Sequence, residues 1–434
     1  MVQRSEDALV SVWLTQRGKL SSWHRGLDTA SGIELLLLPV LAATLFVRAL
    51  TDDLSPADSR HTGTIDLSGA IAVLFMLVAA GMLLRRRHGL LPTALAVLWL
   101  CIWTAVAVNT NGASGETVRE GVREISVVAV FVIVYNARGV TVPIATRLVQ
   151  LMGFVPALVA LYQLVTFTST HRAYGTFAHP DTAAMFFAIA ATASLWRWLD
   201  SGRRRLDAIL MALFAAALVA TASIDGLITL ATMLTALGLL RPGSLRSKLS
   251  LCAIAGVLVL AFFATPLGAH HIARESTTNI ETTGEPNSSL AWRLHKWKTL
   301  IPAWEKSPIF GRGLGTTTTD VGPPGNPYVS KPPHNEYIRY LVETGVVGLT
   351  TLLAALALLI RSLTRRRRIP GTMDEGTLNA SSLALAIVVG CLVNSLADNT
   401  LLASPTGYAA TLIIAAVLAL PVGSITRPGR QRSS

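Results

Sequence analysis

Charged residues are scarce in this chain of 434 residues, where Asp, Glu, Lys and Arg together make up 14%. A soluble globular domain carries roughly 25% charged residues, so the composition excludes an ordinary water-soluble domain. Hydrophobic residues make up 51%, and the mean hydropathy is +0.51. A chain this apolar has too few polar groups to cover a surface in water, which indicates a protein embedded in a membrane.

Cysteine is also rare, and the three cysteines, Cys101, Cys252 and Cys391, all fall inside apolar runs. No pair is placed to close a loop, so the sequence does not support a disulfide framework. The sequence also lacks a His/Cys cluster with the spacing of a metal site. We therefore expect neither a metal nor another cofactor.

The net charge of +12 raises the possibility of a nucleic-acid partner, but the distribution of the basic residues argues against it. Nucleic-acid binders gather basic residues on one folded face. Here they form short clusters between apolar runs, which is typical of cytoplasmic loops. The clusters are Arg85 to Arg87, Arg203 to Arg205, Arg365 to Arg368, and a tail with Arg427, Arg430 and Arg432.

The apolar runs predict the fold class. A membrane span needs about 20 mostly apolar residues, and that window predicts an all-α, polytopic membrane protein with about 12 transmembrane helices in a single integral-membrane domain, 1–434. Several runs are short, so ten or eleven spans stay open, and the pair that flanks Asp225 can be read as one broken helix. The predicted spans lie near 32–50, 67–84, 89–108, 124–138, 149–167, 182–200, 206–222, 226–240, 249–266, 337–362, 381–397 and 405–422.

The basic residues also predict the orientation, because Lys and Arg are enriched in short cytoplasmic loops. Most of the 37 basic residues face the cytoplasm if both termini are cytoplasmic, and we expect a multi-pass protein of the cytoplasmic (inner) membrane. Residues 267–336 then form one large extracytoplasmic loop that contains short helices. A loop of this length is unusual unless it has a function.

Two stretches within this loop have a recognisable pattern. In SLAWRLHKWKTLIPAW, residues 289–304, the apolar residues recur in steps of three and four, which predicts an amphipathic helix. It lies either on the outer membrane surface or against a small core of the loop itself. The glycines of PIFGRGLGTTTTD, residues 308–320, allow backbone N–H groups to approach an anion, although such a stretch is more often only a turn.

Two further outer segments carry ionisable residues at the edge of the apolar region, where such residues are a functional hypothesis. The first is HRAYGTFAHPD, residues 171–181, in which Arg172, His179 and Asp181 either point between the helices or belong to a solvated loop. The second begins at PPHNEYIRYLVETGVVGL, from Pro332. There the spacing places Glu336, Arg339, Tyr340 and Glu343 on one helical face.

Arg339 either pairs with Glu336 or Glu343 or binds a ligand. His334 stands at the mouth of this helix beside Asn335, and histidine titrates near neutral pH. Outward arginines and a histidine without metal ligands suit a phosphate donor and a hydroxyl acceptor, because arginine binds phosphate bidentately and histidine can act as general base. A diphosphate whose charge is held by arginines leaves readily, and the substrate would enter from the lipid.

The motifs of the later half resemble a known family. GRGLG, followed by HNEYIRYLVETGVVGL, is similar to the hallmark of the O-antigen ligase and polymerase superfamily. RAYGTFAHP from Arg172 resembles its Arg-x-x-Gly-Thr-Phe-x-x-Pro segment, and Arg293 precedes PIFGRG as in its Trp-rich helix. The resemblance covers about residues 149–362, with four motifs in order. It implies ten to fourteen spans and a large outer loop before the histidine.

The resemblance also implies a function and its residues. His334 corresponds to the catalytic base, Arg172 and Arg293 to the ligands of a polyprenyl-diphosphate donor, and Glu343 to an acidic residue of the motif helix. Asn335 is a supporting residue. Such a membrane glycosyltransferase, a ligase or polymerase of cell-surface polysaccharide, moves a lipid-linked glycan to a glycan or glycolipid acceptor, with membrane lipid around it.

One departure from the family pattern lies after the seventh predicted span. The family often has Ser-Arg-x-Gly there, whereas TASIDGL places Ile224 and Asp225 at those positions. A donor-binding arginine is then missing, and the candidates to replace it are Arg119, Arg123 and Arg339. Of these we predict Arg339 as a third ligand of the donor diphosphate. We predict Asp225 as a supporting residue.

Two other functions remain as alternatives. A glycosyltransferase that uses a polyprenyl-monophosphate sugar would rely on acidic residues of the first outer loop, such as Asp52 and Asp53. A twelve-helix transporter would instead place polar residues or broken helices in the middle of the membrane.

Overall fold

The computed structural model describes twelve stretches of the chain. They are residues 32–51, 67–86, 90–111, 115–137, 139–166, 172–200, 204–264, 268–269, 289–319, 332–367, 375–400 and 404–420. Every regular element in these stretches is a helix, which confirms the all-α class for the described part. Two parts of the predicted outer side lie outside the described residues. One contains Asp52 and Asp53 of the first outer loop, and the other comprises most of 267–288 and all of 320–331 in the large predicted loop.

Each of the twelve ranges predicted as spans carries a helix. These helices are α2 (Gly32–Leu50), α3 (Leu67–Arg86), α4 (Leu90–Asn111), α5 (Gly115–Asn136), α6 (Val142–Thr166), α7 (Pro180–Asp200), α8 (Arg205–Ala220), α9 (Ile224–Leu240), α10 (Leu245–Phe263), α14 (Glu336–Arg365), α15 (Glu375–Asn394) and α16 (Ser404–Ala419). Among the described residues, six of them, α3, α4, α6, α7, α14 and α15, are long and apolar enough to cross a membrane. A crossing by all twelve stays a prediction.

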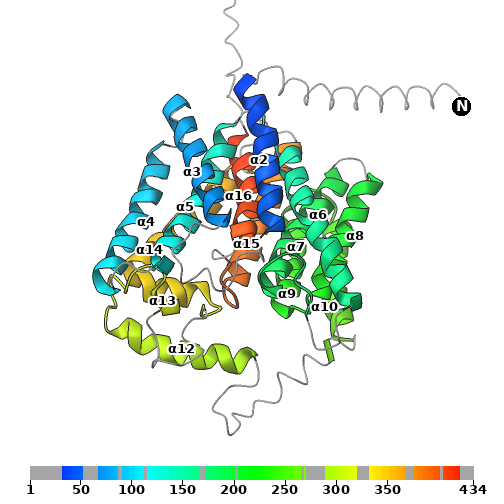
Figure 1. Cartoon of the computed structure of the whole chain (residues 1–434). Helices are drawn as coiled ribbons and strands as arrows, with labels where there is room; N and C mark the ends of the chain where they lie inside the picture. The colour runs from blue at the N-terminus through cyan, green and yellow to red at the C-terminus, as the bar shows by residue number, and fades with distance from the viewer. Residues whose placement is uncertain are drawn as a thin grey trace, which may run out of the picture.

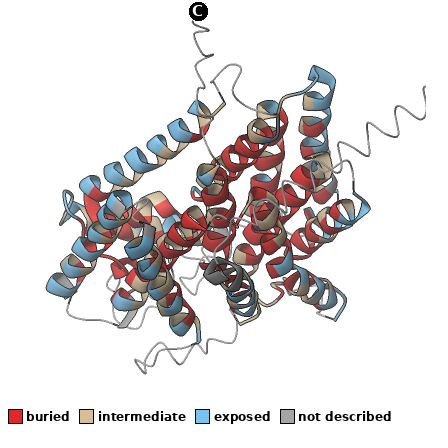
Figure 2. Cartoon of the chain, turned by 90° about the horizontal axis from the view of Figure 1, so that it is seen from above, coloured by how far each residue is buried: buried red, intermediate tan, exposed pale blue. Residues whose placement is uncertain are grey.

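Helix α7 lies at the centre of the bundle. It packs against α6, α8, α9, α15 and α16, and every residue from Ala183 to Arg197 is buried. In contrast, α3 and α4 expose large apolar side chains such as Leu84 and Leu91, as expected for helices that face lipid. Figure 2 shows this arrangement from above, with buried residues inside and exposed ones on the outer helices.

One local feature confirms that the predicted spans 206–222 and 226–240 are two helices, and another departs from the predicted bounds. α8 and α9 are separate helices, because the turn between them contains Ala222 in the left-handed region (φ +49°) and Ser223 caps α9 by accepting a hydrogen bond from the Gly226 N–H. α5 begins at Gly115, so the stretch 109–123, expected to be a loop, is largely helical. Its polar first turns are stabilised by ion pairs within the protein, described below.

One end of the bundle carries the elements of the predicted outer loop (Figure 1). There, α12 (Ser289–Glu305) runs across beneath the bundle, and the short α13 (Thr316–Thr319) lies between α12 and the bundle. α12 packs on α14 through Leu300, Ala303 and Val342. The face of α12 with Leu300 and Ala303 therefore covers the start of α14, whereas Leu294 of the predicted apolar stripe is exposed. We call this end the α12 end.

Candidate functional site

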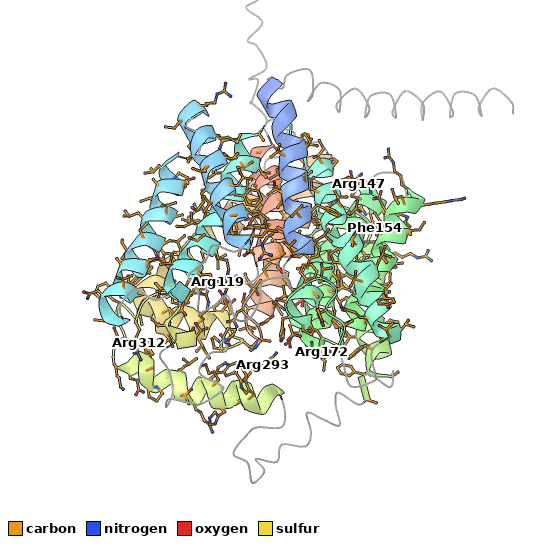
Figure 3. All side chains as sticks on the ribbon, in the orientation of Figure 1. Arg119, Arg147, Phe154, Arg172, Arg293 and Arg312 are labelled. Carbon is orange, nitrogen blue, oxygen red and sulfur yellow. The ribbon has the colours of Figure 1, made fainter. Side chains whose placement is uncertain are left out.

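The arginines predicted to bind a donor lie toward the α12 end. Figure 3 shows Arg172 and Arg293 near α12, whereas Arg147 lies toward the opposite end of the bundle. Four parts of the chain meet here: the turn before α7, the start of α9, α12, and the start of α14 with the end of α15. Charged residues also pair at the opposite end, where Asp207 contacts Arg147 and Arg197.

His334 is held in an unusual backbone conformation directly before α14. Its φ is +49°, a left-handed value that costs a non-glycine residue on the order of 1–2 kcal/mol and persists only where the surroundings enforce it. The next residue, Asn335, caps α14 by accepting a hydrogen bond from the Ile338 N–H at 2.9 Å. The cap and the left-handed residue together fix the direction in which the imidazole leaves the backbone.

An aspartate from the other end of the sequence orients this imidazole. Asp398 Oδ1 lies 2.8 Å from His334 Nδ1, and both side chains are mostly buried. The segment that carries Asp398 is fixed to the start of α14 because Asn335 Nδ2 donates to the Leu396 carbonyl and the Glu336 N–H donates to the Ser395 carbonyl, each at 2.9 Å. The aspartate thus holds one ring nitrogen and directs Nε2 away from itself, an arrangement suited to a general base.

Arg172 is positioned by α7 and by the turn before α9. Its guanidinium pairs with the Asp181 carboxylate, and its Nε donates to the Thr221 carbonyl at 2.9 Å. Ser223 Oγ donates to Asp181 Oδ1 at 2.7 Å. The side chain of Arg172 is 31% exposed, so the pairing leaves part of the fork accessible to a ligand.

The turn that carries Arg172 is clamped to α6. Gln163 Oε1 accepts hydrogen bonds from the N–H groups of Tyr174 and Gly175, and Gln163 Nε2 donates to the Gly175 carbonyl. Gly175 has φ +65°, and a Cβ there would lie 2.5 Å from the Pro156 carbonyl oxygen. The glycine of RAYGTF is therefore required by a left-handed turn in close contact with α6.

Arg293 reaches the site from α12. Its guanidinium Nη2 lies 2.6 Å from Asp225 Oδ2, in the first turn of α9. Burial alone lowers the pKa of Arg293, but the pair with Asp225 more than offsets this and the net pKa is raised, so the arginine stays charged. Ile224 stands where the resembling family often has an arginine, and the next residue, Asp225, holds the arginine of another helix.

Aromatic contacts join these pairs into one site. The ring centroids of His179 and His334 are 5.8 Å apart, and Trp292 meets His334 edge-on at 5.4 Å. Trp292 directly precedes Arg293, and His179 lies two residues before Asp181. The structure thus brings together the sequence-predicted residues His334, Asn335, Arg172, Arg293 and Asp225.

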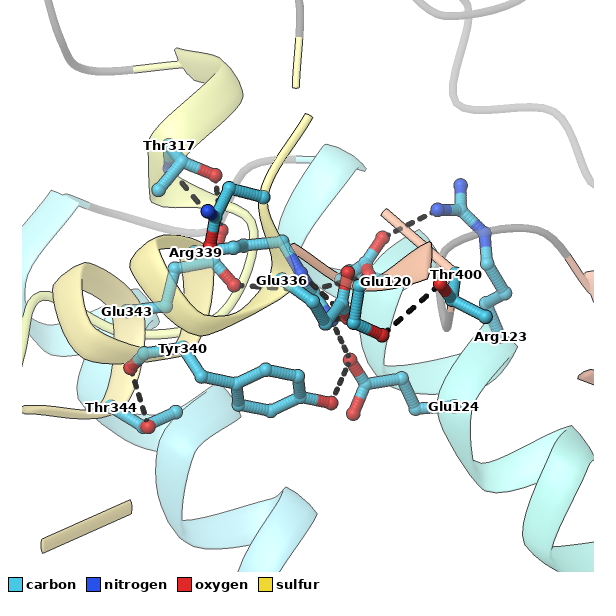
Figure 4. A network of polar contacts seen from close by, with 12 residues as sticks. Glu120, Arg123, Glu124, Thr317, Glu336, Arg339, Tyr340, Glu343, Thr344 and Thr400 are labelled. Atoms are coloured by element: carbon cyan, nitrogen blue, oxygen red, sulfur yellow. Dashed lines mark hydrogen bonds and ion pairs between the residues drawn. The ribbon is translucent and has the colours of Figure 1, made fainter. Parts of the chain in front are cut away.

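Arg339 and Glu343 lie in a separate buried cluster (Figure 4). Arg339 is 1% exposed, and its guanidinium contacts four carboxylates. Glu120, Glu124 and Glu343 accept at 2.9, 3.0 and 3.3 Å, and Glu336 pairs with it as well. Both pairings predicted as the alternative to ligand binding are present. Its predicted role as a donor ligand stays a prediction, and the geometry favours a structural role.

The other partners of this cluster come from three elements. Tyr340 Oη donates to Glu124 at 2.9 Å, Thr317 Oγ1 donates to Glu343 at 2.5 Å, and Arg123 pairs with Glu120 at 2.7 Å. The cluster therefore ties α5, α13 and α14 together. Arg123, a candidate for the missing donor ligand, is engaged by Glu120.

The glycine-rich stretch 308–320 serves packing, and its predicted role in anion binding finds no support in the described geometry. The Arg312 and Gly313 N–H groups donate to the carbonyls of Val342 and Glu343, at 3.0 and 2.7 Å, and the Leu314 N–H donates to Trp103. A Cβ on Gly313 would lie 2.1 Å from Ala107 Cα. These N–H groups are directed at protein carbonyls because the turn is wedged between α4 and the kink of α14 at Gly345 (φ +64°).

The described residues include no group of three or more His, Cys, Asp or Glu side chains placed to hold a metal ion. Asp398 was not among the predicted site residues, although its segment, SLADNT, is a polar break between two apolar runs. The sequence does show that Asp398 is an acidic residue in a short loop at the same end as His334, and this feature could have marked it as a site residue. Its pairing with a histidine 64 positions earlier could not be deduced from spacing.

An apolar bundle with six helices long and apolar enough to cross a membrane, counted over the described residues, defines the class as an integral membrane protein. Residues 209–353 match the family model described as O-Antigen ligase. This stretch contains Asp225, Arg293 and His334, and over it the resemblance to the O-antigen ligase and polymerase superfamily is confirmed. No curated protein matches the chain. The match covers about a third of the chain and indicates a membrane ligase or polymerase of polysaccharide assembly.

Proposed function

We propose that this protein transfers a glycan from a polyprenyl-diphosphate carrier to an acceptor hydroxyl, with His334 as the general base. The observation that carries the proposal is the His334–Asp398 pair beside two arginines, Arg172 and Arg293, at one end of a membrane-embedded bundle. A base and two guanidinium groups are what an acceptor hydroxyl and a diphosphate leaving group require.

The reaction balances with these groups alone. His334 Nε2 takes the proton of the acceptor hydroxyl while the acceptor oxygen forms a bond to the anomeric carbon of the donor glycan. The bond between that carbon and the diphosphate oxygen breaks, and its electron pair leaves with polyprenyl diphosphate. The proton on His334 then passes to water, which restores the base. Asp398 stabilises the imidazolium in between, because its carboxylate lies 2.8 Å from Nδ1.

The arginines supply positive charge where the leaving group develops negative charge. In the structure they pair with Asp181 and Asp225, which keeps both guanidinium groups charged and directed before a donor arrives. We propose that the donor diphosphate engages the same guanidinium groups, and that with two of them present the transfer needs no metal.

The basic clusters support our proposal that this site lies on the outer face of the cytoplasmic membrane. Arg147 and Arg241 lie at the opposite ends of their helices from the site, with the clusters assigned to the cytoplasm. The acceptor, a glycan or a glycolipid, therefore meets the donor outside the cytoplasm. Ligation and polymerisation both fit this chemistry.

Two substitutions test the proposal by separating rate from binding. His334→Ala removes the base and should lower kcat by roughly 10²–10⁴-fold with little change in donor affinity. Arg172→Lys keeps a charge but loses the bidentate fork, so donor affinity should fall while the base remains. Transfer is assayed with purified enzyme and lipid-linked donor in excess chelator.

Matched controls are available on exposed positions. His295→Ala on α12 and Arg361→Lys near the end of α14, both exposed, should leave transfer unchanged. A His334→Ala protein that purifies as a single species and keeps most of its turnover would remove His334 from the mechanism. Activity that is lost on chelation and restored by divalent ions would instead favour the alternative built on Asp52 and Asp53.

A further inference from the structure

A second histidine stands beside the proposed base, and the mechanism above does not use it. His179 ends the turn before α7, and its ring centroid lies 5.8 Å from that of His334. The side chain of His179 is half-exposed. Two imidazoles this close cannot both be protonated without strong repulsion, so the protonation of one depends on the other.

The surroundings of the two rings differ in a way that decides which ring carries a proton. His334 has a carboxylate of its own, since Asp398 lies at hydrogen-bond distance from Nδ1. The carboxylate near His179 is 3.5 Å from Nδ1 and belongs to Asp181, which already pairs with Arg172 and accepts from Ser223. Most of the attraction that could stabilise a charged His179 is thus committed elsewhere.

A backbone contact also favours the neutral ring of His179. The Asp181 N–H points at His179 Nδ1 at 3.3 Å, which makes this nitrogen an acceptor and assigns the ring proton to Nε2. Protonation of Nδ1 would break this weak hydrogen bond, because the new Nδ1–H and the Asp181 N–H are both donors. Partial burial, together with the neighbouring His334 and Arg172, lowers the pKa of His179 against the opposing effect of Asp181 and Asp398.

From this geometry we propose that His179 is a positioning residue that remains neutral and thereby sets the proton affinity of His334 during glycosyl transfer. The inference rests on the proposed function of His334 as the base. A neutral neighbour lets His334 accept the acceptor proton without repulsion, whereas a charged neighbour makes it a weaker base. The charged and titratable groups that face His179 are Asp181 on α7, His334 before α14, Asp398 after α15, and Arg172 in its own turn.

A charge placed at position 179 tests this directly. Two unit charges 5.8 Å apart in a medium of effective dielectric constant about 20–40 shift a titration by about 1–2 pH units. His179→Arg should therefore move the acid limb of the kcat profile to lower pH by about 1–2 units and lower the plateau rate. His179→Gln is neutral and can still accept the Asp181 N–H, so its acid limb should stay within about 0.3 units of the wild type, a small fraction of that electrostatic shift.

A second measurement keeps the test decisive if His179→Arg is inactive. The pH dependence of His334 modification by diethylpyrocarbonate, read by peptide mass spectrometry, gives the same titration without turnover. Glu305→Gln, which changes the charge by the same sign on the exposed end of α12, controls for the general field of the protein.

The outcomes distinguish the inference from the function on which it rests. An acid limb and a His334 modification midpoint that do not move in His179→Arg would overturn the role of His179 and leave His334 as the base. A His334→Ala variant that keeps the acid limb of the wild-type pH profile would instead refute the proposed function. Equal shifts in His179→Arg and Glu305→Gln would also overturn the inference, because the effect would then not be local.

Discussion

Replacing Arg339 by Gln should destabilise the fold before it affects catalysis. The guanidinium of Arg339 is buried and contacts the carboxylates of Glu120, Glu124, Glu336 and Glu343. Removal of one partner from a buried ion pair costs about 3–5 kcal/mol, because the other charge is left uncompensated. Several carboxylates can take up protons in response, so we expect the lower end, about 3 kcal/mol.

This loss can be measured by thermal unfolding of the detergent-purified protein, followed by tryptophan fluorescence. About 3 kcal/mol corresponds to a fall in Tm on the order of 5 °C. A second substitution, Glu124→Gln in the Arg339→Gln background, removes one uncompensated carboxylate and keeps an acceptor for Tyr340 Oη, so it should recover part of the loss. Donor affinity of the folded fraction should match that of the wild type.

The opposite pattern would refute this reasoning. An Arg339→Gln protein with the wild-type Tm, no recovery from Glu124→Gln and a donor affinity weakened tenfold or more would make Arg339 a donor ligand, as the sequence first predicted. The two roles differ in which property fails, so one purified variant decides between them.

Two further predictions follow from the glycine turn and from the orientation. Gly313→Ala should prevent folding or abolish transfer, because φ is +98° and the added Cβ would lie 2.1 Å from Ala107 Cα. Gly81→Ala in α3 is the matched control, since a Cβ there would meet nothing within 4 Å. This control should leave yield and Tm unchanged or raise the free energy of unfolding by up to about 1 kcal/mol. With the three natural cysteines replaced, a cysteine at exposed Lys298 on α12 should react with an impermeant maleimide in intact cells, whereas one at exposed Arg361 should react only after permeabilisation. The reverse labelling pattern would place the site in the cytoplasm.

The helical architecture could be predicted from the sequence because long apolar runs leave few other structures in a membrane. Each predicted run carries a helix, and the errors concern polar ends. The predicted span near 124–138 leaves out the first turns of α5, which begins at Gly115, because Glu116, Arg119 and Glu120 are polar. These turns are helical because the Glu120 carboxylate pairs with Arg339, more than 200 residues later. Hydropathy contains no information about such a partner.

Site residues could be predicted from the sequence where their residue type and motif indicate their role. They could not be predicted where the role depends on contact with a residue distant in the sequence. His334, Arg172 and Arg293 were found from their residue types and motifs, and they lie at one end of the bundle. Asp398 and the contact of His179 with His334 depend on packing between distant segments. Arg339 shows the same limit, because its helical spacing from Glu336 and Glu343 allowed both an ion pair and a ligand site, and only the positions of Glu120 and Glu124 make the ion pair dominant.

The carboxylates beside the donor arginines bear on which ligand can bind. If Arg172 and Arg293 hold the donor as proposed, an incoming anion must compete with Asp181 and Asp225, which already contact these guanidinium groups. A monoanion would only replace one carboxylate charge with another, at a cost in desolvation. A diphosphate spans two guanidinium groups and brings more than one negative charge, so it gains from both arginines at once. Asp225→Asn removes a negative charge that repels the ligand, so it should tighten the binding of pyrophosphate more than that of inorganic phosphate, and equal tightening of both would contradict this account of selectivity.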